Sequence, residues 1–113
     1  MEARLQSSVM VGALKRLAES QGGFAAVLRR GDSQAGAIVV MLAEKGVKLR
    51  ILERSLQSDG RYAWQDVGKQ AVENEEQTER FLERRRKFDP DLWIIELDIA
   101  SVERFAAEMN LTL

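Results

Sequence analysis

Two short charged motifs hold the residue types with which this chain could bind or react. Residues 29–32 read Arg-Arg-Gly-Asp, and residues 88–93 read Phe-Asp-Pro-Asp-Leu-Trp. Guanidinium groups and carboxylates either pair with one another or hold a charged ligand. With two arginines that precede the second motif, they form the set of candidate binding residues: Arg29, Arg30, Asp32, Arg84, Arg86, Asp89, Asp91 and Trp93.

The composition excludes several kinds of chemistry. The chain has 113 residues and contains neither histidine nor cysteine. Disulfides, zinc and iron–sulfur sites, and Ser-His-Asp or Cys-His catalysis are therefore excluded. We predict no catalytic residue, no metal ligand and no cofactor. The sequence favours a non-catalytic binding or protein-interaction module, and the alternative is a small-ligand or enzymatic site built from the arginines and carboxylates of the two motifs.

A run of four basic residues at 84–87 raises the question of nucleic-acid binding. Residues 73–87 hold five acidic and five basic side chains, and the whole chain has a net charge of −1. Acids near the start and bases near the end of a helix are favoured by its dipole and by pairs one turn apart. A self-paired helix exposed to solvent is thus the simpler interpretation, and a nucleic-acid accessory role ranks below both other functions.

Arg85 is the one basic residue that the helical spacing directs into an apolar stripe. It lies four residues after Phe81, three after Leu82 and three before Phe88. A guanidinium there must reach solvent along its own aliphatic stem, pair with an acid, or bind a ligand. The acids that we consider as partners are Asp32, Asp89, Asp91 and Glu96.

The Arg-Gly-Asp tripeptide at residues 30–32 is interpreted as a turn between two strands, because no secretion signal accompanies it. We expect Gly31 to supply a positive φ and the Asp32 carboxylate to bond to its own backbone, as in a hairpin connection.

Hydrophobic periodicity and turn signals predict eight elements. Helices are expected over residues 8–21 and 73–88 and after Ser101, and Ser7 or Ser8 is expected to cap the first helix. Strands are expected over residues 24–30, 35–42, 47–54, 62–67 and 92–98.

The order of these elements predicts an α/β (α+β) fold, with residues 1–113 as a single domain. Strand 35–42 and the first half of strand 92–98 are apolar on both faces, so both belong in the middle of a sheet. We predict a mixed, mostly antiparallel sheet of about five strands with helices packed on both faces. If the two central strands pair in parallel, the two charged motifs become neighbours, and Arg29 or Arg30 would face Asp89 or Asp91.

Residues 29–39 and 88–96 together resemble a small bacterial family of unknown function that carries the patterns RRGD..AGA and FDPDLW..E. The resemblance covers about residues 4–97, and the last helix lies beyond it. It implies a single-domain α/β protein, and it draws attention to the candidate binding residues without supplying an activity.

The sequence also bears on location and partners. The longest apolar stretch, residues 35–43, has nine residues, whereas a helix needs about 20 to span a bilayer. We expect a cytoplasmic protein without a membrane anchor. Its partner would be an unknown protein or a small ligand, and a homodimer is also compatible with the sequence.

Overall fold

The computed structural model describes residues 6–69 and 71–113. The elements follow in the order α1 (Ser7–Ser20), β1 (Phe24–Arg29), β2 (Ile38–Glu44), β3 (Val47–Leu56), β4 (Tyr62–Asp66), the short 3-10 helix η1 (Ala71–Glu73), α2 (Glu75–Phe88), β5 (Trp93–Asp98) and α3 (Val102–Thr112).

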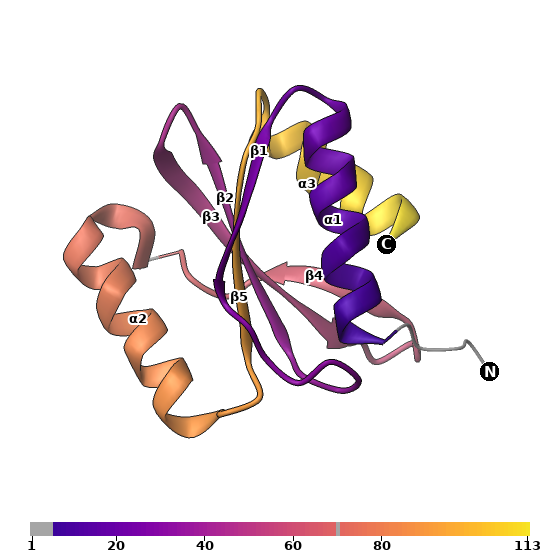
Figure 1. Cartoon of the computed structure of the whole chain (residues 1–113), viewed down its shortest axis with the longest axis vertical. Coiled ribbons are helices and arrows are strands. Elements are labelled where there is room, and N and C mark those ends of the chain that lie inside the picture. The colour runs from indigo at the N-terminus through magenta and orange to yellow at the C-terminus, as the bar shows by residue number, and fades with distance from the viewer. Residues whose placement is uncertain (1–5, 70) are drawn as a thin grey trace.

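The five strands form one mixed sheet in the order β1-β5-β2-β3-β4. Only β2 and β5 pair in parallel, and the other three pairings are antiparallel. Helices cover both faces of the sheet, with α2 on one side and α1 and α3 on the other (Figure 1). The predicted α+β fold, with its mixed and mostly antiparallel sheet, is therefore confirmed.

The two strands that are apolar on both faces occupy the centre, as predicted. Successive side chains of β2 enter two different cores because a strand alternates its faces. Val40 and Leu42 pack under α1 and α3, whereas Val39 and Met41 pack under α2. Two-sided burial explains why the hydrophobic run of β2 is continuous rather than alternating.

The face under α2 has the smaller core. Within α2, only Thr78 and Leu82 are buried, and Phe81 is partly buried beside them. Phe88 was expected in the apolar stripe, but 81% of its surface is exposed. It is the last residue of the helix, just before the turn at Asp89-Pro90-Asp91, so its side chain extends past the edge of the core.

The predicted starts of one strand and one helix need correction. The strand predicted from residue 35 begins at Ile38, because residues 35–37 belong to the preceding loop. The helix predicted from residue 73 begins at Glu75, with Asn74 as the N-cap that accepts a hydrogen bond from the Gln77 backbone.

The N-terminus of α1 also differs from the expected serine cap. Gln6 is the N-cap residue and makes no side-chain cap hydrogen bond. The Ser7 and Ser8 backbone N–H groups donate instead to the Gln34 and Ser33 carbonyls, at 3.2 and 2.9 Å. The loop before β2 thereby satisfies donors that a capping side chain would otherwise serve.

Among the described residues, no helix is both long enough and apolar enough to span a membrane.

Two leucines give a matched test of the sheet's position in the core. Leu97 in β5 is fully buried, whereas Leu111 in α3 is 85% exposed. We expect Leu97→Ala to lower the free energy of unfolding by about 2–5 kcal/mol and Leu111→Ala to change it by less than about 0.5 kcal/mol. Urea unfolding followed by circular dichroism measures both, and equal midpoints for the two variants would contradict the central position of β5.

Candidate functional site

The two charged motifs meet at the start of β5. Because β2 and β5 run in parallel, the segments that lead into them lie at the same end of the sheet, where both strands start. The Asp32 backbone N–H donates to the Asp91 carbonyl at 3.0 Å, and the Trp93 indole Nε1 donates to the Asp32 carbonyl at 2.7 Å. Arg29 Nη2 donates to the Pro90 carbonyl at 2.8 Å. The predicted proximity of the motifs is confirmed.

Two glycines explain how closely these segments approach. A Cβ atom at either Gly31 or Gly36 would lie 2.2 Å from the Asp91 carbonyl oxygen, which is far inside van der Waals contact. Gly31 has no positive φ, so the expected turn conformation is wrong. Close packing of two backbones is the reason for glycine at both positions. The connection is not a hairpin either, since β5 lies between β1 and β2.

The charged side chains of this junction do not pair across it. Within the described residues, no ion pair joins Arg29 or Arg30 to Asp89 or Asp91, contrary to our expectation. The Asp32 carboxylate accepts hydrogen bonds from the backbone of residues 34 and 35, as expected, and the Asp89 carboxylate accepts one from the backbone of Asp91. The carboxylates therefore stabilise their own turns.

Trp93 completes the junction. Its ring is almost fully buried, and the Arg30 guanidinium lies over it at 5.9 Å from the ring centroid. Six of the eight predicted site residues thus come together here, but their contacts hold the loops to one another. A role of these six in ligand binding stays a prediction.

The two remaining predicted residues, Arg84 and Arg86, lie on α2, the helix that ends just before Asp89. Arg86 pairs with Glu83 at 3.5 Å on the same helix. Arg85 pairs with Glu53 of β3, which was not among the acids that we considered. Glu96, which was considered, pairs with Lys48 at 3.6 Å. Glu53 faces α2 because it shares a strand face with Ile51 of the core beneath the helix.

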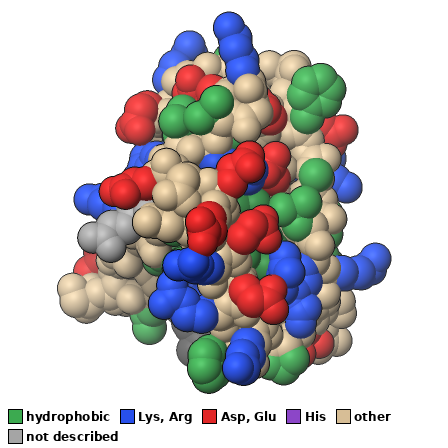
Figure 2. All heavy atoms as spheres, turned by 90° about the vertical axis from the view of Figure 1, so that its left-hand side faces the viewer, with side chains coloured by type: hydrophobic (Ala, Val, Ile, Leu, Met, Phe, Trp, Pro, Cys, Tyr) green, Lys and Arg blue, Asp and Glu red, His purple; other side chains and the backbone are tan. Residues whose placement is uncertain are grey.

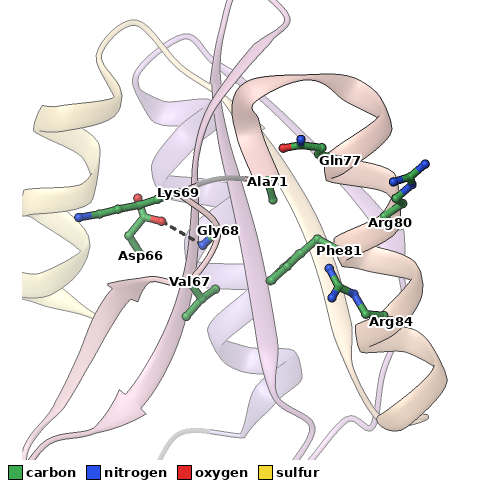
Figure 3. A pocket seen from close by; sticks show the side chains of 9 residues that line it. All are labelled: Asp66, Val67, Gly68, Lys69, Ala71, Gln77, Arg80, Phe81 and Arg84. Carbon is green, nitrogen blue, oxygen red and sulfur yellow. Dashed lines mark hydrogen bonds between the residues drawn. The ribbon is translucent and has the colours of Figure 1, made fainter.

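Arg84 borders a groove of about 600 Å³ between α2 and the segment that follows β4. The groove is lined by Asp66, Val67, Gly68, Lys69, Ala71, Gln77, Arg80, Phe81 and Arg84. Figure 3 shows Phe81 and Arg84 extending from α2 toward the strand side, whereas the side chain of Lys69 extends away from the helix.

Backbone contacts fix the strand side of the groove. The Val67 N–H donates to the Ile51 carbonyl at 2.8 Å, which continues the sheet past the end of β4. A Cβ at Gly68 would lie 2.7 Å from Ile51 Cδ1, so a larger residue would push this wall away from β3. The Gly68 carbonyl accepts from the Ala71 N–H at 3.0 Å, which begins the turn into η1.

The charged side chains that line the groove differ in whether they have a partner. Asp66 accepts hydrogen bonds from Arg50 at 3.2 Å and from the Gly68 N–H at 3.1 Å. Arg80 pairs with Glu76 of the same helix. In the part of the chain that the structure describes, Arg84 has no ion-pair partner. An unpaired guanidinium therefore lies on the same side of α2 as the partly buried ring of Phe81 (Figure 3).

The sequence identified Arg84 as a candidate but did not identify its surroundings. The spacing of Phe81 and Arg84 places both on one side of a helix. The segment opposite them has no comparable pattern, because it is positioned by backbone hydrogen bonds to β3.

Comparisons with known proteins agree with this architecture. Residues 5–107 match the model of a family described as "Protein of unknown function (DUF1491)", and the chain belongs to that family. A DUF1491 family protein from Caulobacter crescentus CB15, known from a crystal structure, is 30% identical with a TM-score of 0.79, covering 90% of this chain and 94% of that one. The solution structure of protein Atu0922 from A. tumefaciens is 32% identical with a TM-score of 0.70, covering 92% and 93%. A search of curated proteins finds no match.

Glycine substitutions test the junction. We expect Gly36→Ala to destabilise the fold by about 3 kcal/mol or more, because the new methyl group would overlap the Asp91 carbonyl. Gly12→Ala is the matched control, since its Cβ would meet only the end of the flexible Arg16 side chain in α1. That change should stabilise the helix by up to about 1 kcal/mol. Thermal unfolding of both variants measures the difference, and a neutral Gly36→Ala would refute the close packing.

Proposed function

We propose that this member of the DUF1491 family is a non-catalytic module that binds a short apolar and acidic segment of a partner protein in the groove between α2 and residues 66–69 and 71. The observation that carries the proposal is the pair formed by Phe81 and Arg84, which extend together toward the groove while Arg84 lacks an ion-pair partner in the described chain.

The apolar part of the groove would bind an apolar side chain of the partner. Phe81 is only partly buried, and Val67 opposite it is 40% exposed. Covering an aromatic ring and a valine removes apolar surface from water, at about 25 cal/mol for each Å². The volume of about 600 Å³ lies in the range of ligand sites and holds a few side chains.

The polar part of the groove would bind a carboxylate. Arginine offers two parallel N–H donors that match a carboxylate, and Arg84 is free to use them. Gln77, which also lines the groove, carries an amide that can bond to a peptide backbone. An acidic group beside an apolar one is therefore the chemistry that these walls recognise.

The same contacts argue against the alternatives. Among the described residues that line the groove, the one carboxylate is that of Asp66, and it is already held by Arg50 and by a backbone N–H, so it is poorly placed as a base. The basic run at 84–87 does not offer four free charges to a nucleic acid, since Arg85 and Arg86 pair with glutamates. Figure 2 shows acidic and basic side chains interspersed over the face that carries α2, which is unfavourable for a polyanion.

The proposal includes a cytoplasmic location, with which a chain lacking cysteine is compatible.

Peptide titration tests the groove. The probe is a blocked peptide of alternating leucine and glutamate, added to isotope-labelled protein while amide chemical shifts are recorded. We expect saturable shifts at Val67, Gly68 and Phe81, and an affinity at least about tenfold weaker for Arg84→Glu, because a lost charge-assisted contact is worth about 1.5–3 kcal/mol.

The matched control is Arg104→Glu, which changes an exposed arginine of α3 on the opposite face of the sheet. It should leave the peptide affinity unchanged. A lysine and leucine peptide should not bind. Equal binding of both peptides, or equal losses in both arginine variants, would refute the proposed recognition, and saturation by glutamate alone would indicate a small-ligand site instead.

A further inference from the structure

The free edge of β1 is the least protected part of the sheet. β1 pairs only with β5, so its other edge has no strand beside it among the described residues. The opposite edge of the sheet is partly covered, because Asn110 of α3 accepts from the Trp64 N–H at 2.7 Å and donates to the Trp64 carbonyl at 3.4 Å. An uncovered edge offers backbone donors and acceptors to another strand.

The side chains of β1 do not discourage such pairing. Phe24, Val27 and Leu28 are 77%, 41% and 47% exposed, which is unusual for three large apolar residues within one short strand. Soluble proteins commonly blunt an edge with lysine or proline, and β1 contains neither. Its one irregularity, between Val27 and Arg29, leaves residues 24–27 regular.

We propose that two copies of this chain associate through β1, antiparallel and about a two-fold axis, to form one continuous sheet of ten strands. With the axis through Ala26, that residue lies opposite its own copy, and every other contact is made twice. Because residue 28 is skipped at the irregularity between Val27 and Arg29, Phe24 of one copy then lies opposite Arg29 of the other, and Arg30 lies beside Gly23.

Charge complementarity favours a second copy of this chain over an unrelated strand as the partner of β1. The carboxyl end of β1 is basic, through Arg29 and Arg30. The other end borders a cavity of about 560 Å³ that Phe24 lines and whose charged lining residues are Glu44, Asp98 and Lys45, so acidic side chains outnumber basic ones there. Antiparallel pairing brings the basic end of each copy to the acidic cavity of the other. It also places an arginine near the exposed ring of Phe24, where a cation can contact the aromatic face.

The apolar surface continues from β1 into that cavity, which supports an interface broader than one strand. Val47 and Leu49 line the same cavity and are exposed. They lie in the segment where β3 leaves the β2–β3 hairpin, whose tip is held by Asp98 through hydrogen bonds to the Lys45 and Gly46 N–H groups. The receiving surface is therefore fixed before a second copy arrives.

Sedimentation equilibrium over a concentration series tests this association. The wild-type protein should approach twice its mass of 12.8 kDa. Leu28→Lys and Phe24→Lys should stay monomeric, because each puts a charge into the interface. Leu111→Lys is the control on an exposed residue of α3 and should dimerise like the wild type. Circular dichroism confirms that each variant is folded.

Two further measurements distinguish pairing through β1 from association through another surface. Arg30→Glu should weaken the dimer at least tenfold at low salt, because it places an acid at the acidic cavity. In a mixed sample of labelled and unlabelled protein, intermolecular contacts should join Ala25 of one copy to Val27 of the other. Arg84→Glu should leave dimerisation intact, so a failure of the groove and a failure of this interface are distinguishable.

A wild-type protein that is monomeric at every concentration would overturn the proposal. So would assemblies larger than a dimer, which a closed two-fold contact forbids. Equal disruption by Leu28→Lys and Leu111→Lys would also overturn it, because the association would then not depend on β1.

Discussion

The contact between the Asp91 carbonyl and the two glycines, Gly31 and Gly36, determines where the central strands begin. It holds the start of β5 against the loop before β2, and the parallel register of Ile38 with Trp93 follows directly. The same loop supplies carbonyl acceptors to the first N–H groups of α1. One packing constraint therefore aligns both buried strands and a helix. Any side chain beyond hydrogen at these glycines would displace all three.

This arrangement explains why the contacts of the two charged motifs hold the loops to one another. Their polar groups are used in backbone hydrogen bonds and turn contacts, and Trp93 is used as a buried anchor with its indole N–H satisfied. Surfaces available for recognition lie where the scaffold is complete but a neighbour is missing. The groove beside α2 is one such surface. The helix is fixed by Leu82 in the core and by the Arg85–Glu53 pair, so Phe81 and Arg84 are presented on a rigid support.

The sequence predicted the features that depend on burial along the chain. The two-sided apolar runs identified β2 and β5 as central, and their parallel pairing placed the two motifs together. Features that depend on register between distant strands were missed. Glu53 became the partner of Arg85 only because β3 pairs with β2 in one register, which no local pattern encodes. Gly31 was assigned to a turn because periodicity cannot show that another backbone passes within contact distance. The groove was missed for the same reason, since one wall is held by a backbone hydrogen bond from Val67 to Ile51.

The groove and the free edge of β1 lie at opposite ends of the strand order, and this separation has a consequence for both proposals. The groove is built on β3 and the segment after β4, so β5 and β2 stand between it and β1. A two-fold axis that relates antiparallel neighbours runs perpendicular to the sheet. Pairing through β1 would therefore leave both α2 helices on the same face, with their two grooves at the far ends. Such a dimer would present two equivalent sites to one side. A partner with two suitable segments would then bind more tightly than either groove alone, because its second contact is intramolecular.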